Sequence, residues 1–330
     1  MIKVQDLTKD FKIRKKDPGF KGALKSLFSN EYDIKKAVSN ISFEIEEGEV
    51  VGYIGSNGAG KSTTIKMMTG ILTPSSGNIE VNGRVPYKDR EKNAKDIGVV
   101  FGQRTQLWWD LPLTETFTIL KDIYSVEDNL FNKNMEFLNE VLGLEEFINN
   151  PVRTLSLGQR MRADLAASLI HSPKILYLDE PTIGLDVVVK DKVREAIKKI
   201  NKEFNTTIIL TTHDLSDIEE LCERIIIIDN GNKIYDGSLN DIKSSFGYMI
   251  TLEAQIKGDI KTNLNLKEEF NINDIEEYID DGRLIIKFNK NKVTSSEVIY
   301  KVMQKIDILD FSLKETSIED IIKKIYKKGV

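Results

Sequence analysis

The sequence predicts an α/β protein built on a buried parallel β-sheet, followed by a second, smaller α+β domain. Three apolar runs, at residues 50–54, 175–178 and 208–212, lack the polar alternation of half-exposed strands. Such runs are typical of parallel strands covered on both faces. Near residue 240 the pattern changes to short strands and amphipathic helices, and this change marks the second domain.

A glycine-rich segment connects the first of these runs to a helix-like stretch. In such a loop successive backbone N–H groups converge on phosphates, Lys61 reaches the β- and γ-phosphates, and Ser62 offers its hydroxyl to Mg²⁺. The strand before it and the helix after it are the context that this motif requires. We therefore expect a nucleoside triphosphate site at Gly55, Ser56, Asn57, Gly58, Ala59, Gly60, Lys61, Ser62 and Thr63.

A second candidate phosphate site lies at residues 155–159, before a stretch with the apolar spacing of an amphipathic helix. Ser156 is expected to cap that helix, and the exposed N–H groups at its start would attract an anion. Taken alone, a serine before a helix is an ordinary N-cap.

Together these segments resemble the ATP-binding-cassette (ABC) ATPases. The P-loop, Gln103, residues 156–159, Asp179 with Glu180, Asp186 and His213 occur in the order of that family and at similar spacings. Leu157 is one departure, because the family usually has glycine there. The resemblance implies a P-loop ABC nucleotide-binding domain with a RecA-like core, an antiparallel β layer and a helical subdomain.

The resemblance also implies roles for the matched residues. Asp179, at the carboxyl end of the run 175–178, is expected to hold Mg²⁺, and Glu180 to orient the attacking water. That general-base contribution is typically about 10²- to 10⁴-fold. The expected catalytic residues are Glu180, His213 and Gln103, and the expected Mg²⁺ ligands are Ser62, Gln103 and Asp179. Nucleotide contacts are expected from the P-loop and from Phe11, Ser156, Gly158, Gln159 and Asp186, although Phe11 is almost as well explained as a core residue.

Two phosphate-binding elements on one chain suggest that Ser156 of one subunit closes over ATP held by the P-loop of another. The resemblance implies a head-to-tail homodimer that ATP closes and hydrolysis opens. A single-cassette chain suits a two-fold arrangement in which both partners use the same surface.

Composition narrows the remaining possibilities. The 330 residues suffice for about two domains by the usual length prior. No apolar run approaches the roughly 20 residues of a membrane helix, and residues 1–6 lack the apolar region of a signal peptide. The single cysteine, Cys222, excludes an internal disulfide and favours the reducing cytosol. The net charge of −5 does not indicate the basic surface that nucleic-acid-binding proteins usually have.

The domain boundary is expected after residue 238. Residues 1–238 would form the cassette, with the helical subdomain at about 106–168, and 239–330 a C-terminal α+β accessory domain. In the latter we expect a strand at 248–256, a hairpin at 275–288 that turns at Asp281 and Gly282, and then two helices. This domain could support or regulate a dimer, or it could be an inert packing domain.

Two segments are candidate contacts with partners. The insert 12–36 belongs to a basic region, and its residues 20–28 have helical spacing, so it could dock on a membrane subunit or on an anionic membrane surface, or pack on its own domain. Trp108 and Trp109 could meet a membrane subunit or lie in the core of the helical insert.

The stretches 99–112, 155–162 and 181–186 resemble the viologen and fluoroquinolone exporter branch of ABC-2 ATPases. That resemblance implies an ATPase subunit on the cytoplasmic face of the cell membrane, attached to one or two types of polytopic permease subunit and driving drug efflux. The alternatives are an importer ATPase and a non-transport ABC ATPase acting on ribosomes or DNA. Members of the last class carry two cassettes, coiled coils or zinc modules, whereas this sequence has one P-loop and one cysteine.

Overall fold

The computed structural model describes residues 1–14, 32–102, 104–246, 248–257 and 264–328. Two compact units make up the chain, Met1–Gly237 and Ser238–Val330. Residues 20–28, the candidate docking helix, and Gln103, a predicted catalytic and metal-binding residue, lie outside the described residues.

A six-stranded sheet forms the centre of the first unit, with strand order β5-β6-β7-β3-β8-β9. Its first five strands run parallel, as predicted, and the apolar runs of β6, β7 and β3 are almost completely buried. The carboxyl ends of β3, β6 and β7 therefore lie at one edge of the sheet. The strands are β3 (Val50–Gly55), β5 (Ile97–Phe101), β6 (Ile175–Asp179), β7 (Thr207–Thr211), β8 (Arg224–Asp229) and β9 (Asn232–Ser238).

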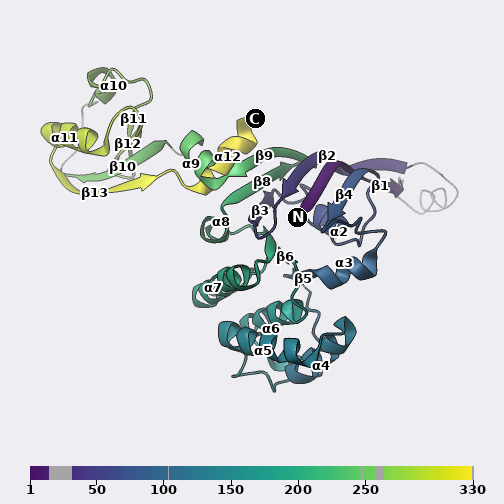
Figure 1. Cartoon of the computed structure of the whole chain (residues 1–330). Helices are drawn as coiled ribbons and strands as arrows, with labels where there is room; N and C mark the ends of the chain where they lie inside the picture. Colours follow the sequence, from purple (N-terminus) through teal and green to yellow (C-terminus); the bar gives the residue numbers. More distant parts are fainter. Residues whose placement is uncertain (15–31, 103, 247, 258–263, 329–330) are drawn as a thin grey trace, which may run out of the picture. The chain divides into compact units, whose positions relative to one another are not determined.

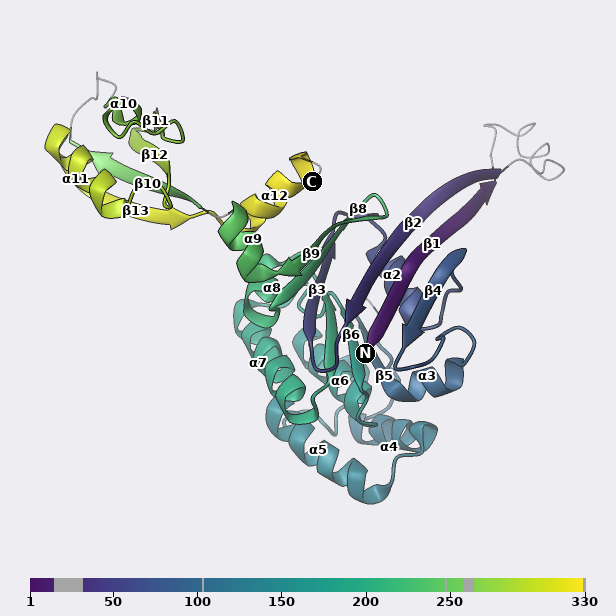
Figure 2. The ribbon, with the colours of Figure 1, turned by 45° about the horizontal axis from the view of Figure 1, so that its top comes forward.

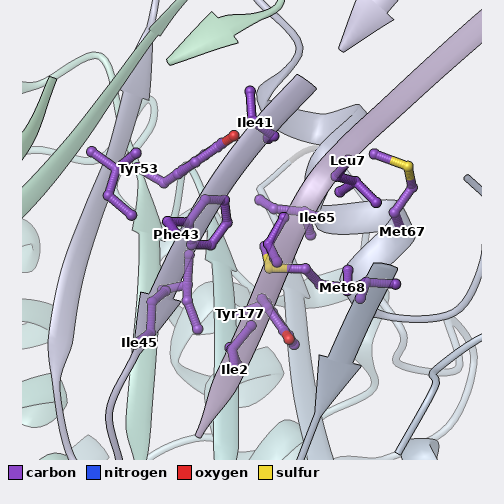
Figure 3. Packing of buried hydrophobic residues seen from close by; sticks show 14 of the residues in the cluster. Ile2, Leu7, Ile41, Phe43, Ile45, Tyr53, Ile65, Met67, Met68 and Tyr177 are labelled. Carbon is purple, nitrogen blue, oxygen red and sulfur yellow. The ribbon is translucent and has the colours of Figure 1, made fainter. Parts of the chain in front are cut away.

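A smaller antiparallel sheet, β2-β1-β4, lies beside the first (Figure 2). Its strands are β1 (Ile2–Arg14), β2 (Tyr32–Ile45) and β4 (Ser76–Val81), and Ile2 pairs with Ile45 on one side and Val81 on the other. Helix α2 (Lys61–Met68), which follows β3, joins both sheets in one hydrophobic core (Figure 3). That core includes Ile2, Leu7, Ile41, Phe43, Ile45, Tyr53, Ile65, Met67, Met68 and Tyr177.

The remaining helices of this unit fall into two sets. A helical group of α4 (Leu113–Tyr124), α5 (Asp128–Leu142) and α6 (Leu157–Leu169) occupies the stretch for which the sequence predicts a helical subdomain (Figure 1). The others are α3 (Arg90–Asp96), α7 (Val187–Phe204) and α8 (Leu215–Leu221). None of the helices in the described ranges combines the length and the apolar character that a bilayer crossing requires.

One buried carboxyl group connects the helical group to the central sheet. Asp164, in α6, is 6% exposed and accepts hydrogen bonds from Thr105 Oγ1 at 2.9 Å and from the Gln106 backbone N–H at 3.1 Å. The segment that leaves β5 is thereby held against α6. Burial raises the pKa of Asp164 to about 6, although both hydrogen bonds act in the opposite direction.

The second unit contains a four-stranded antiparallel sheet, β11-β12-β10-β13. Its strands are β10 (Met249–Ile256), β11 (Glu276–Asp280), β12 (Arg283–Asn289) and β13 (Ile308–Glu315), and its helices are α9 (Leu239–Phe246), α10 (Leu266–Glu269), α11 (Ser295–Lys305) and α12 (Ile318–Lys328). The predicted hairpin turn is confirmed, because Asp281 and Gly282 both have positive φ, 46° and 74°, as a type I′ turn requires.

The expectation of two consecutive helices after this hairpin is incomplete, because β13 lies between α11 and α12. Its alternation, with Phe311 and Leu313 between Asp310, Ser312 and Lys314, is the period-two pattern of a strand. The sequence analysis missed this strand because it lies between two strongly amphipathic helices.

Replacing Asp164 by asparagine should remove a pH dependence of stability. The folded protein binds this proton more tightly than the unfolded chain, whose ordinary Asp pKa is 3.8. The stabilisation is therefore fully present below pH 3.8 and is lost as the pH rises through 6. Between roughly pH 5 and 7.5, wild type should lose about 1.4 kcal/mol relative to Asp164→Asn, measured by urea unfolding with tryptophan fluorescence. Parallel pH profiles for the two proteins would contradict this assignment.

Candidate functional site

A cavity of about 640 Å³ opens where the parallel strands β5 and β6 end, beside helix α2. Its lining brings together residues that are far apart in the sequence: Phe11, Ser62, Thr63, Arg104, Asp179 and Glu180. Ligands in open α/β sheets bind at this edge, outside the carboxyl ends of the strands. Phe11, the predicted adenine contact, is among them, and Lys9 Nζ lies 5.3 Å from the centre of its ring.

The glycines of the predicted phosphate loop are required by its backbone. Gly58 and Gly60 have φ values of 82° and 110°, in the left-handed region that other residues rarely adopt. A Cβ on Gly60 would also lie 2.4 Å from the carbonyl oxygen of Ala37. The loop therefore bends tightly, and it passes directly into the N-terminus of α2.

Lys61 lies along this loop. Its Nζ donates to the carbonyl oxygens of Gly55 at 2.6 Å and Ser56 at 3.2 Å, and the residue is 7% exposed. Burial lowers its pKa, while the carboxylates of Glu180 and Asp179 act to raise it. The carbonyl oxygens that hold this buried ammonium are neutral. Phosphate oxygens carry negative charge, so the ammonium is suited to exchange the carbonyl oxygens for them.

Asp179 is the second polar group of the cleft, at the end of β6. Ser62 Oγ lies 3.4 Å from one of its carboxylate oxygens, and Thr211 Oγ1 donates to the other. A hydroxyl and a carboxylate side by side are hard oxygen ligands of the kind that Mg²⁺ prefers. In the described residues no group of three or more acidic, histidine or cysteine side chains is arranged so that it could hold a metal ion by itself. The donor set fits Mg²⁺, which usually takes one or two carboxylates together with substrate phosphates.

Glu180 follows Asp179 in a strained backbone conformation. Its φ is 58°, which costs a residue with a side chain about 1–3 kcal/mol, and its backbone N–H donates to Thr211 O at 2.9 Å. The conformation turns the carboxylate toward His213, whose Nε2 lies 2.9 Å from Glu180 Oε1. His213 follows β7, as predicted, and is thus placed beside the residue that the resemblance assigns to the attacking water.

A buried network that the sequence analysis missed holds these two segments together. Asp217 is completely buried in α8 and accepts hydrogen bonds from Thr182 Oγ1 and, at 2.8 Å, from Thr212 Oγ1. The same carboxyl group pairs with Arg194 of α7, whose Nε lies 2.8 Å from Asp217 Oδ1. The network therefore links the segment after Glu180 to the segment before His213. In the sequence, Asp217 had only the appearance of an acidic residue in the first turn of a helix.

The predicted cap of α6 is confirmed. Gln159 N–H donates to Ser156 Oγ at 3.2 Å, and Ser156 N–H donates to Gln159 Oε1 at 2.9 Å, which is a capping box. Asp186 caps α7 in a similar way by accepting from Val189 N–H at 3.0 Å. Leu157 lies near the turn at Gly184, because a Cβ added to Gly184 would be 3.1 Å from Leu157 Cδ2.

This second phosphate-binding element is separate from the cavity within one chain. Among the described residues, Ser156, Gly158, Gln159 and Asp186 are absent from the lining of the 640 Å³ cavity. His213 is not part of that lining either, although it reaches the cleft through Glu180. Within the ranges that the structure describes, no hydrogen bond or ion pair joins residues 156–159 or Asp186 to the phosphate loop.

Trp108 and Trp109 are exposed, 38% and 49%, so the alternative that they form the core of the helical group is wrong. The guanidinium of Arg160 stacks 4.6 Å from the ring centre of Trp109. Neighbouring Leu107 is buried and anchors the segment.

Comparison with known proteins agrees with this geometry. A family model described as "ABC transporter" matches residues 38–183. The linearmycin resistance ATP-binding protein LnrL of Bacillus subtilis is 32% identical over 290 residues, 87% of this chain and 93% of that protein. The methionine import ATP-binding protein MetN of Geobacillus kaustophilus is 35% identical over 207 residues, 62% of this chain and 60% of that protein.

Among solved structures, a dimeric ATP-binding cassette in a post-hydrolysis state, bound to ADP and Pi, superimposes with a TM-score of 0.59. It is 27% identical and covers 72% of this chain and 99% of its own. The phosphate loop, the carboxylates at the ends of the parallel strands and these matches lead to one conclusion: the chain belongs to the ATP-binding proteins of ABC transporters and is an ATPase whose hydrolysis of ATP is coupled to transport.

Proposed function

We propose that this chain is the ATPase subunit of an ABC-2 type exporter. The observation that carries the proposal is the extent of the match with LnrL, which covers 87% of the chain, whereas the match with MetN covers 62%. A match of 290 residues is longer than the cassette, so the similarity to LnrL extends into the C-terminal accessory domain, residues 239–330. The likeness of residues 99–112 to drug-exporter ATPases supports a drug or another toxic organic compound as the cargo.

Hydrolysis is assigned to the residues that meet at the cleft. Lys61 and the loop N–H groups hold the β- and γ-phosphates, and Glu180 orients the attacking water, accepting its proton as the bond to phosphorus forms. His213 keeps the Glu180 carboxylate in place through the 2.9 Å contact, and it is proposed to contact the γ-phosphate. When bound, Mg²⁺ at Ser62 and Asp179 neutralises phosphate charge, and Gln103 is proposed as a further ligand.

The functional unit is proposed to be a homodimer. The capped N-terminus of α6 presents free N–H groups and a positive dipole end, yet it lies outside the cavity of its own chain. A second copy would place Ser156, Gly158 and Gln159 over the γ-phosphate, with Asp186 beside them. The solved relative described above is dimeric, which supports this arrangement.

Membrane subunits are the proposed partners, and the exposed Trp108–Trp109 surface is the proposed docking site. Large aromatic side chains dominate the binding energy of many interfaces. Through these polytopic permease subunits the chain would lie at the cytoplasmic face of the membrane, and the basic insert 12–36 is proposed as a further contact, with anionic lipid. An importer subunit is the second candidate, favoured by the identity with MetN over the cassette.

Replacing Glu180 by glutamine should leave ATP binding intact and lower kcat by about 10²- to 10⁴-fold, because the amide cannot accept the proton of the attacking water. ATP should then accumulate a stable dimer. Steady-state hydrolysis, nucleotide-binding titration and sedimentation velocity with ATP measure the three quantities. Unchanged turnover would remove Glu180 from its assigned role.

Replacing Trp108 and Trp109 together by serine should abolish capture of polytopic membrane proteins when the tagged chain is purified from its native membranes. ATP hydrolysis by the isolated chain should stay within about twofold of wild type, since neither side chain lines the nucleotide cavity. Tyr300→Ser, at a 62% exposed aromatic in the second unit, is the matched control and should retain capture. Recovery of ribosomes or DNA with the wild-type chain would contradict the transport assignment.

A further inference from the structure

Strand β13 forms one edge of the sheet in the second unit, with β10 on its inner side (Figure 1). In the described part of the chain no strand pairs with its outer side. Edge strands present unpaired N–H and C=O groups, and proteins usually protect them with proline, bulges, inward charges or short length. Here the strand is eight residues long and lacks proline, and its register irregularity lies at its start, between Ile308 and Asp310.

The register shows which backbone groups face outward. The N–H of Thr316 donates to Met249 O at 3.2 Å, and β13 continues from there with Lys314 opposite Thr251 and Ser312 opposite Glu253. In an antiparallel pair, alternate residues bond to the neighbouring strand. Asp310, Ser312 and Lys314 therefore bond to β10, and the backbone groups of Phe311 and Leu313 point to the open side. Consistently, Phe311 N–H donates to the side chain of Asp310, at 2.8 Å.

Apolar side chains gather along the same strand. Leu309, Phe311 and Leu313 are 60%, 44% and 43% exposed, although Phe311 and Leu313 lie opposite the buried residues Ala254 and Leu252. They thus share the face of the sheet that carries its core, and they extend that face beyond the cover of the helices. A strand added outside β13 would complete both the hydrogen-bond ladder and this apolar face.

We propose that the added strand is β13 of a second copy, antiparallel and related by a two-fold axis through Ser312. In this register Phe311 lies opposite the second copy's Leu313, and Asp310 opposite the second copy's Lys314. The symmetry repeats both pairs, so that two apolar pairs form on one face and two oppositely charged pairs on the other. In one copy Phe311 N–H donates to the Asp310 carboxylate, and Lys314 pairs with Glu253. In the dimer Phe311 N–H would donate to a backbone carbonyl of the second copy instead. The Asp310 carboxylate would then be available to the second copy's Lys314.

The opposite edge of the sheet shows why this partner is favoured over others. Strand β11 contains three acidic residues, Glu276, Glu277 and Asp280, and no basic one. Pairing β11 with itself would therefore set like charges near one another, which is unfavourable. Pairing β11 with β13 of another copy would be head-to-tail and would extend into an open filament. Only β13 is complementary to itself and gives a closed dimer.

The test uses the full chain without nucleotide, so that ATP-driven closure of the cassettes does not contribute. Wild type should show a monomer–dimer equilibrium in sedimentation velocity over a series of concentrations. Asp310→Lys and Lys314→Asp should each raise the dissociation constant by about tenfold, because each turns two attractive pairs into repulsive ones. Mixing the two variants should restore association, since a mixed pair sets only opposite charges across the interface.

Asp280→Lys, on the β11 edge, is the control and should leave the equilibrium unchanged. A second measurement uses Ser312→Cys, because residues directly opposite in a non-hydrogen-bonded pair have Cα atoms about 4.5 Å apart, within disulfide range. Oxidation should give a covalent dimer, whereas Tyr278→Cys at the centre of β11 should remain monomeric; the natural Cys222 is buried. A monomeric wild type, a dimer that both charge variants leave unchanged, or a mixture that fails to associate would overturn the proposal.

Discussion

The site depends on one constraint of the fold: β3, β6 and β7 run parallel and lie next to one another, so their carboxyl ends meet at one edge. Ser62 and Asp179 are 117 positions apart in the chain, yet their oxygens are 3.4 Å apart. Each strand contributes one element there: the phosphate loop after β3, two carboxylates at the end of β6 and a histidine after β7. Because the strands are buried on both faces, their positions at this edge are rigid.

The buried Asp217–Arg194 pair stabilises what the strands bring together. Glu180 adopts a backbone conformation with positive φ, which costs free energy that surrounding contacts must offset. Thr182 and Thr212 donate to the same completely buried carboxylate and hold the flanking segments of Glu180 and His213. Removing one partner of such a buried ion pair typically costs about 3–5 kcal/mol. The geometry of the proposed catalytic pair, Glu180 and His213, therefore depends on residues that do not line the cavity.

Local patterns in the sequence were enough for much of this architecture. The phosphate loop, the cap at Ser156 and the turn at Asp281–Gly282 were predictable because each depends on neighbouring residues with special backbone or capping chemistry. The parallel sheet was predictable from its apolar runs. By contrast, Asp164 and Asp217 became recognisable only in three dimensions, since their partners come from other elements and a single carboxylate in a helix looks like a solvated one. Strand β13 was missed for a related reason, because its pairing with β10 is long-range.

The proposed homodimer requires a working site that two copies share, with the phosphate loop of one copy and the capped helix α6 of the other. Complementation tests this claim most directly. Lys61→Ala removes the phosphate contact of one copy, and Ser156→Arg blocks the capped helix, so each variant alone should be inactive. In an equal mixture, random pairing gives half mixed dimers with one intact site of two, and activity should return to about a quarter of wild type. Recovery to that level in steady-state ATP hydrolysis is the predicted result, and a mixture as inactive as its components would contradict the shared site.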